Sequence, residues 1–322
     1  MTRFFRTFPM IAALAVLLVF PMFGQIFYTE LVAKTLILAI FAMSLDLLVG
    51  YTGLVSFGHA AYFGIAAYAI PLLTPAGAVN AIWWILPVSV LAAALAALLI
   101  GVFVLRTKGI YFIMVTLAFA QMAFFLFHDT DLGGGSDGIF LNSKPTVTVF
   151  GLEALTLENP THIYYFVLAL TVSVYLLLRW LLKTSFGHIL IGIRSNEHRM
   201  VAMGYNTFHY KLAIFTIAGA LAGLAGFLQV VLTGFVTPEM LAWHQSGNVL
   251  LVVILGGIGT LIGPVLGAFT FIALQEFAQG LVDRWQLVMG IFIILVVFAL
   301  PGGLAAIPAR LRRRLVKGAD ND

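Results

Sequence analysis

Two ionisable residues in the apolar part of the chain are the first candidates for chemistry. Asp46 lies near the end of a long apolar run, and His59 stands at the start of the next one. An ionised carboxylate among apolar residues is unfavourable unless it faces a polar cavity or a partner. Asp46 therefore indicates either a path for a polar solute or a cap on the glycine turn at Gly50. A lone histidine such as His59 is more often a packed hydrogen-bonding residue than a ligand.

No constellation of residues in the sequence points to an enzyme. The chain has no cysteine, which removes disulfides, Cys-ligated zinc and thiol catalysis. It contains neither an H-E-x-x-H zinc motif nor a G-x-x-x-x-G-K-[ST] phosphate loop. We expect no catalytic residue, no metal site and no cofactor bound by this chain. If the protein moves a solute with ATP, another chain must hydrolyse the ATP.

Composition defines the elements that must position these residues. Of the 322 residues, 62% are hydrophobic and only 9% are charged, and the mean hydropathy is +1.07. A soluble domain carries about 25% charged residues, so soluble enzymes and disordered chains are both excluded. Several apolar runs approach the roughly 20 residues that a helix needs to cross a bilayer. The composition predicts an all-α polytopic membrane protein in the lipid bilayer.

The apolar runs predict how many helices cross the membrane. We expect spans at 9–28, 31–49, 57–73, 82–105, 109–127, 163–182, 210–232, a broken stretch 248–281, and 285–300. The broken stretch allows 8 full transmembrane helices plus a re-entrant pair, or 10 transmembrane helices. No small-x-small cleavage site follows the first run, so we interpret it as a retained helix. The prediction is a single transmembrane domain over 1–322, with about 9–303 embedded in the membrane.

Basic residues are distributed unequally between the two sides of the predicted bundle. If the helices alternate, only Lys34, Lys144 and Arg284 fall on one side, and the other fourteen of the 17 basic residues fall on the opposite side. The positive-inside rule places that richer side in the cytoplasm. Both termini are then cytoplasmic, and 304–322 is a basic cytoplasmic tail. The net charge of +4 reflects topology, so no nucleic acid partner is expected.

Two predicted connections are too long to be simple turns. The extracytoplasmic loop 128–161 contains an alternating piece at 146–150 that predicts a short strand. The cytoplasmic segment 184–209 mixes polar and apolar residues and predicts short amphipathic helices. Both charge signs occur in it, which favours docking on another protein over lying on lipid. Its candidate docking residues are Arg194, Asn196, Glu197, Arg199 and Gly204.

Glycines interrupt the predicted helices at two places, which we call the first break (residues 50–58) and the second break (residues 256–263). Irregular backbone at membrane depth is tolerated where protein or a water-filled cavity covers it, and transporters place substrate sites there. Close helix packing is the alternative use of these glycines. The candidate residues for a transport path are Asp46, Gly53, Ser56, Gly58, His59, Gly256, Gly257, Gly259 and Gly263. Because both breaks open into a helix of small residues, they also hint at a duplicated architecture.

Three glutamines and one glutamate within the predicted spans are further polar candidates. These are Gln121, Gln229, Gln275 and Glu276. Amide side chains commonly form hydrogen bonds between helices inside a membrane. We expect helix–helix hydrogen bonding from these residues in preference to contact with a substrate.

Several motifs together resemble the branched-chain amino acid ABC transporter permeases of the LivM family. The similarity extends from about Leu36 to Gly303, with the motifs in family order. The matching motifs are SLDLLVGYTG (44–53), SFGHAAY (56–62), RTKGIYF (106–112) with TLAF (116–119), GGSDG (134–138), FG (186–187) with IR (193–194), GALAGLAG (219–226), GFVTPE (234–239) and GGIGTLIGP (256–264).

The resemblance implies an inner-membrane permease subunit of an ABC importer that takes up branched-chain or related amino acids. It implies four kinds of contact: a second related permease subunit, two cytoplasmic ATP-binding subunits that hold ATP-Mg, a periplasmic solute-binding protein, and the bilayer. The segment 184–209 resembles the Glu-Ala-Ala…Gly coupling segment of such importers, with 128–161 as the periplasmic loop.

The sequence departs from the family pattern at three points. His198 and Arg199 stand where the general coupling pattern has alanines, His188 follows Phe-Gly where many relatives have arginine, and Asp46 stands where many have asparagine. Urea-type permeases resemble this region too. Import of urea, short amides or aromatic acids therefore remains an alternative, as does an ATP-independent channel or secondary carrier. A membrane-embedded enzyme has less support, because no cluster of catalytic groups is found.

Overall fold

The computed structural model describes residues 4–306, except 24, 75–80, 142, 150–151, 282–283 and 301. Nearly all of the predicted basic tail lies outside the described residues. The helices are α1 (Phe4–Phe23), α2 (Ile26–Val49), α3 (His59–Leu73), α4 (Ile82–Val104), α5 (Ile110–His128), α6 (Pro160–Lys183), α7 (Ser185–Ser195), α8 (Glu197–Ala202), α9 (Thr207–Thr233), α10 (Trp243–Gly256), α11 (Gly263–Leu281) and α12 (Trp285–Ala299). Short 3₁₀ segments are η1 (Asp131–Gly133), η2 (Gly135–Asp137), η3 (Pro238–Leu241) and η4 (Leu304–Ala306).

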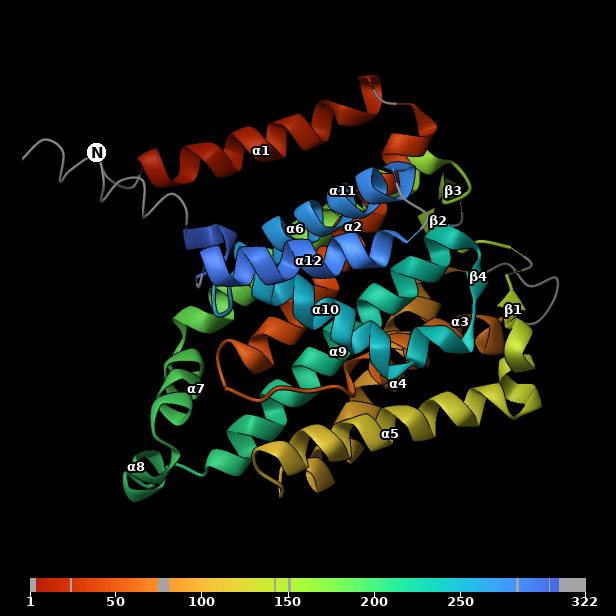
Figure 1. Ribbon diagram of the computed structural model, residues 1–322. Helices are drawn as coiled ribbons and strands as arrows, with labels where there is room; N and C mark the ends of the chain where they lie inside the picture. The colour runs from red at the N-terminus through yellow and green to blue at the C-terminus, as the bar shows by residue number, and fades with distance from the viewer. Residues whose placement is uncertain are drawn as a thin grey trace, which may run out of the picture.

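The helices form one bundle with two distinct ends. Helices α7 and α8 lie beyond one end, which we call the α7 end, and the β-strands lie at the other, the strand end (Figure 1). Strand β2 (Thr146–Val149) pairs with β3 (Leu152–Thr156), and β1 (Ile139–Phe140) pairs with β4 (Phe235–Val236). The strand predicted at 146–150 is thus confirmed. So are the short helices predicted in 184–209, which are α7 and α8.

Length and composition confirm the predicted membrane-protein class. Six helical segments among the described residues are long and apolar enough to cross a membrane: α2, α4, α5, α6, α9 and the segment that begins with α12. Parts of α1 and α3 are shorter apolar helices. The protein is an all-α polytopic membrane protein, as the composition predicts.

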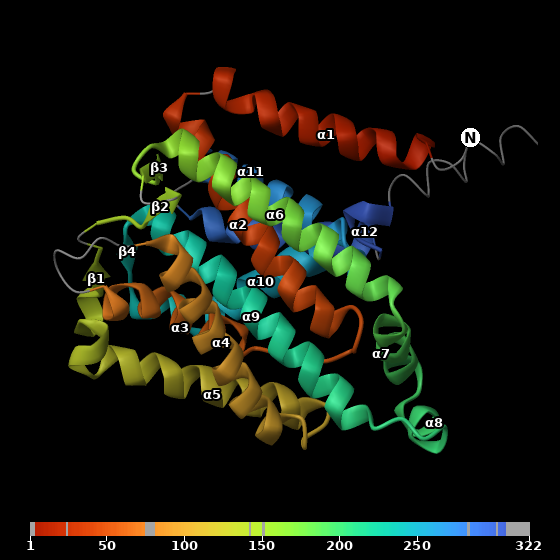
Figure 2. The same cartoon turned by 180° about the vertical axis from the view of Figure 1, so that it is seen from behind.

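Helices α2 and α9 form the centre of the bundle. Their most apolar windows are 83% and 78% buried, compared with 17% for α5. Figure 2 shows α2 between α6 and α9, both of which it contacts. Small residues of α9 also let α3 pack closely on it, since a Cβ added to Gly226 would lie 1.9 Å from the carbonyl oxygen of Phe63 in α3. Most of the remaining helices present a large apolar surface outward, as membrane helices do.

Two short helices, α3 and α10, begin inside the bundle. Each follows a long central helix and a segment without α-helix: residues 50–58 precede α3, and residues 234–242, which include β4 and η3, precede α10. A helix of about 15 residues spans about 22 Å, less than the hydrocarbon core. Their N-terminal turns meet, where the amide of Ala60 donates to the hydroxyl of Ser246 at 2.8 Å. The architectural counterpart of the first break is therefore the segment 234–242, and not the second break as the sequence hinted.

Helices α10 and α11 form a hairpin whose tip is the second break. This tip lies at the α7 end, since an added Cβ on Gly259 would lie 3.4 Å from the guanidinium of Arg194 in α7. Helix α10 begins at Trp243, earlier than the start at 248 predicted from hydropathy. Since α3 and α10 begin inside the bundle, neither runs from one end to the other. The choice between the two predicted arrangements, 8 full transmembrane helices plus a re-entrant pair or 10 transmembrane helices, stays a prediction.

Candidate translocation and coupling site

Asp46 connects helix α2 to the second break. Its side chain is buried in the last turn of α2. Oδ1 accepts a hydrogen bond of 2.8 Å from the backbone amide of Gly259, 213 residues further along the chain. Asp46 therefore caps the turn between α10 and α11 rather than the turn at Gly50. The carboxylate holds the end of one central helix against the tip of a distant hairpin.

Gly50 is required where α2 meets that hairpin. A Cβ built on Gly50 would lie 2.4 Å from Oδ1 of Asp46 and 2.6 Å from the backbone of Gly259. Gly259 itself has a φ of +77°, a conformation that side-chain-bearing residues rarely adopt. The two glycines let the backbones of the first and second breaks approach closely at the α7 end.

Arg194 joins helix α7 to the same contact. It lies in the last turn of α7, and its guanidinium donates to the carbonyl oxygen of Gly50. Its aliphatic part lies near Gly53, where an added Cβ would be 3.5 Å from Cγ. Sequence analysis assigned Arg194 to docking and Asp46, Gly53 and Gly259 to the path. The structure brings these groups together, and we call Asp46, Gly50, Arg194 and Gly259 the Arg194 cluster.

The remaining glycines of the second break shape the hairpin tip. A Cβ on Gly256 would lie 1.9 Å from the carbonyl oxygen of Gly263. Gly257 has a φ of +118° and lies against Gly302, just before η4. The second break therefore packs against the end of the segment that follows α12 as well as against α2.

The residues of the first break differ in burial in this conformation. Ser56 and His59 have no exposed surface, whereas Gly53 is exposed. The hydroxyl of Ser56 accepts from the amide of Gly58 at 3.2 Å, and Nε2 of His59 lies 3.0 Å from the hydroxyl of Ser44. His59 is thus a packed hydrogen-bonding residue, as expected of a lone histidine. Its position at the start of α3, beside α10, keeps it a candidate path residue.

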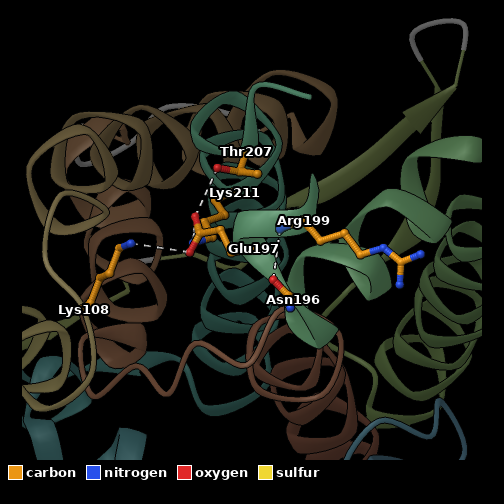
Figure 3. A network of polar contacts seen from close by, with 6 residues as sticks. All are labelled: Lys108, Asn196, Glu197, Arg199, Thr207 and Lys211. Atoms are coloured by element: carbon orange, nitrogen blue, oxygen red, sulfur yellow. Dashed lines mark hydrogen bonds and ion pairs between the residues drawn. The ribbon is translucent and has the colours of Figure 1, made fainter. Parts of the chain in front are cut away.

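A second polar cluster fixes α8 to its neighbours (Figure 3). Oε1 of Glu197 lies 2.6 Å from Nζ of Lys211 and accepts from the hydroxyl of Thr207 at 3.1 Å. Oε2 lies 3.8 Å from Nζ of Lys108. Glu197 therefore ties α8 to the start of α9 and to the connection after α4. We call Lys108, Glu197, Thr207 and Lys211 the Glu197 cluster.

Electrostatics favour the charged form of Glu197. Partial burial acts to raise the pKa of this carboxyl group. The hydrogen bonds from Lys211 and Thr207 and the charges of Lys211 and Lys108 outweigh that effect, so the pKa of Glu197 lies below its usual value. Glu197 is therefore ionised at neutral pH and forms ion pairs that hold α8 in place.

The other predicted docking residues have distinct positions around α8. Asn196 caps the helix, because its Oδ1 accepts from the amide of Arg199 at 3.0 Å. The side chain of Arg199 extends away from Glu197 (Figure 3). Gly204 has a φ of +87° and ends the helix. Of the five predicted docking residues, Arg194 and Glu197 point into this chain, and Arg199 extends outward.

The partners of these residues were not predicted from the sequence. Lys108 and Lys211 were interpreted as topological charges only, and Thr207 was not a candidate. One signal was present, since Glu197 is the lone acidic residue of segment 184–209 and Lys211 stands at the start of an apolar run. A lone acid near a basic residue at a helix start indicates an ion pair.

The fold and these clusters define a class of protein. Apolar helices with two short helices starting inside the bundle are the architecture in which transport proteins form solute paths, and α7–α8 extend beyond one end. A family profile described as "Branched-chain amino acid transport system / permease component" matches residues 27–297. The chain belongs to this family. It is a membrane permease subunit of an ABC importer, a class that works with an ATPase and a solute-binding protein.

Individual relatives agree with the family. The chain is 29% identical to the high-affinity branched-chain amino acid transport system permease protein LivM of Escherichia coli, over 90% of this chain and 72% of that protein. The same protein of Salmonella typhimurium is 29% identical over 85% and 69%. A probable LivM of Methanocaldococcus jannaschii is 24% identical over 82% and 89%. No solved structure matches the chain significantly.

Proposed function

We propose that this chain forms half of the translocation path of an importer for branched-chain or related amino acids. The observation that carries the proposal is the Arg194 cluster, in which a residue of α7 is bonded to the end of central helix α2 and lies beside the tip of the α10–α11 hairpin. An ATPase that moves α7 would move both breaks together. The relatives, which are branched-chain amino acid permeases by name, supply the solute class.

The proposed assembly has a second related permease subunit, two cytoplasmic ATPase subunits that bind ATP-Mg, and a periplasmic solute-binding protein. This chain binds no cofactor and hydrolyses nothing. It lies in a bacterial inner membrane with the α7 end and both termini in the cytoplasm and the strand end in the periplasm. The excess of basic residues near the α7 end supports this orientation.

The α7–α8 segment is the proposed ATPase dock. Helix α7 is 11 residues long. One face carries exposed polar side chains, and the other is buried and includes Leu190 and Ile193. The Glu197 cluster holds α8 against α9 from within, which leaves outward groups such as Arg199 to meet the ATPase. Force on this segment then passes to α2 through Arg194 and to α9 through Lys211.

Uptake by the reconstituted complex tests the proposal. Proteoliposomes with both permease subunits, both ATPases and the binding protein should accumulate leucine, isoleucine or valine only when ATP is supplied to the ATPase side. This chain alone should be inert. Uptake by this chain alone would establish a channel or carrier instead. ATP-driven uptake of urea, amides or aromatic acids without any branched-chain amino acid would establish the alternative solutes.

A further inference from the structure

A cavity of about 640 Å³ opens on the side of the bundle between α2, α10, α11 and α12. Its lining runs from Trp285, at the start of α12, to Phe41 and Phe63 in the middle of the bundle. It therefore extends inward from the strand end and is closed by residues next to the start of α3. None of the residues in the Arg194 or Glu197 clusters lines it, so it is separate from the site described above.

The cavity gathers six polar side chains from five helices. They are Lys34, Gln229, Gln245, Asn248, Gln275 and Gln286. Helix–helix hydrogen bonds were expected of Gln229 and Gln275. Among the described residues, however, none of the six side chains has a hydrogen bond or ion pair. Polar groups at membrane depth are costly unless they are paired or face a polar solute. Their convergence on one cavity indicates a polar ligand.

Lys34 supplies the one positive charge of the lining. It lies eight residues after the start of α2, which corresponds to about 12 Å of helix, and its side chain is exposed to the cavity. Glu30, one turn earlier on α2, is not among the lining residues, and the structure records no ion pair between it and Lys34. An uncommitted ammonium group at this depth favours an anionic partner, and a carboxylate fits best.

The rest of the lining is apolar and lies deeper. Ile37 and Phe41 of α2, Val249 of α10 and Ile272 of α11 line the cavity on its inner side. The rings of Phe41 and Phe63 are stacked at 4.7 Å and close the floor. A pocket of several hundred Å³ with an apolar wall and a few polar groups is the usual form of a small-molecule site.

We propose that this cavity binds an α-amino acid with an apolar side chain on its way through the membrane, an inference that rests on the proposed function and places its solute. The carboxylate pairs with Lys34, the amide oxygens of Gln245, Asn248 and Gln275 accept from the ammonium group, and the side chain lies against Ile37 and Phe41. One cation and several neutral acceptors match a zwitterion. A lipid acyl chain would leave five amides unpaired.

The position of the cavity also connects it to the switching parts of the chain. Phe41 forms its floor and stacks on His59 at 5.9 Å, at the start of α3. The same helix α2 carries Lys34 at the cavity and Asp46 at the Arg194 cluster. A solute on the floor therefore touches α2, the helix that Arg194 links to α7, and α3, which follows the first break.

Protection of a single cysteine tests the inference in the assembled importer in nanodiscs. The chain has no native cysteine, so Asn248→Cys gives one thiol in the cavity. L-leucine should slow its reaction with a thiol reagent, and L-leucinol, which lacks the carboxylate, should not. Lys34→Gln should raise the leucine concentration for half protection about tenfold or more, because a hydrogen bond to a charged group is lost. Lys34→Arg should return the leucine concentration for half protection to that of the chain with Lys34.

Arg284→Gln is the matched control, because it removes a positive charge from the same end and does not line the cavity. It should leave protection unchanged. Protection that depends on anionic lipid and not on leucine would overturn the inference in favour of a lipid site, and so would equal effects of Lys34→Gln and Arg284→Gln. ATP-driven leucine uptake measured in parallel separates the two proposals: uptake without protection refutes the cavity site alone, whereas protection without any amino acid uptake refutes the transport function.

Discussion

At the scale of single residues, the contact that Asp46 makes in the structure differs from the roles predicted for it from the sequence. The sequence left it as a path residue or a cap on its own helix end. Its carboxylate instead accepts from Gly259 in a distant turn, and Oδ2 has no hydrogen-bond partner among the described residues. The essential property is therefore an acceptor atom at Oδ1, which an asparagine also offers.

We expect Asp46→Asn to retain the contact and Asp46→Ala to break it. Alanine leaves the amide of Gly259 buried without a partner, which costs about 1–3 kcal/mol. Thermal unfolding of the purified complex should show a clear loss for alanine and less than half of that loss for asparagine, with uptake rates in the same order. Equal stability of the two variants would mean that the hydrogen bond to Gly259 contributes nothing.

Gly50 gives a second prediction, which depends on space alone. Its φ of −80° suits any residue, so only the added methyl group matters. That group would overlap Asp46 and Gly259, and overpacking of this kind costs about 1–3 kcal/mol. We expect Gly50→Ala to lower the melting temperature of the complex and its uptake rate.

Gly280→Ala is the control for the Gly50 substitution. It lies in α11, and an added Cβ would meet nothing within 4 Å. Alanine is favoured over glycine in a helix by about 0.5–1 kcal/mol, so this variant should be as stable as the natural chain or slightly more so. If both glycine substitutions have the same effect, the close approach at Gly50 is not important.

At the scale of elements, Arg194 connects the α7–α8 segment, which is the proposed ATPase dock, to the bundle. Arg194→Ala should therefore uncouple the importer. ATP hydrolysis by the assembled complex should continue, while the amount of solute imported per ATP should fall about tenfold, in line with the loss of a charge-assisted hydrogen bond. Lys183→Ala removes an exposed basic residue at the same end and should leave the ratio unchanged. A fall in hydrolysis and uptake together would indicate lost docking instead.

The contact between α8 and α9 depends on the charge of Glu197, so it should depend on pH. The pKa of Glu197 is lower in the folded protein than its usual value of 4.5. Its stabilising contribution is then fully present above that usual value and is lost as the pH falls through the lower folded pKa. The protection factors of the α8 amides, which are corrected for the intrinsic pH dependence of exchange, should stay constant at neutral and mildly acidic pH and fall only below about pH 4.5.

Glu197→Gln keeps an acceptor for Lys211 and Thr207 but removes the charge. We expect a loss of about 1 kcal/mol, seen as roughly fivefold lower protection factors in α8 at neutral pH, with no further fall on acidification. An unchanged pH dependence in this variant would show that another group titrates.

At the scale of the whole molecule, sequence alone predicted the helices well and their junctions poorly. Apolar runs mark helices to within a few residues because the bilayer requires a minimum apolar length. Helix α10 is the exception. Its start contains Trp243, His244 and Gln245, whose polarity hides the first turn from a hydropathy window, although Gln245 faces the cavity.

The site was predictable in its residue types and not in its contacts. Glycines mark the breaks, because close approach and positive φ need them. No spacing along one chain, however, reveals that Asp46 contacts Gly259 or that Arg194 contacts Gly50. Each of these pairs joins residues far apart in the sequence, and their proximity follows from how α2 packs against the α10–α11 hairpin and α7.

The proposed function requires the α7 end in the cytoplasm and the strand end in the periplasm. Two cysteine substitutions can test this orientation. Ser136 is exposed at the strand end, and Ser195 is exposed at the end of α7. In intact spheroplasts, a membrane-impermeant maleimide should label Ser136→Cys and spare Ser195→Cys. Inverted vesicles should give the opposite result, and detergent-solubilised protein should label at both positions. The excess of basic residues near the α7 end is the physical reason, since such residues are retained in the cytoplasm. Labelling of Ser195→Cys from outside would place the α7 end where no ATPase can reach it.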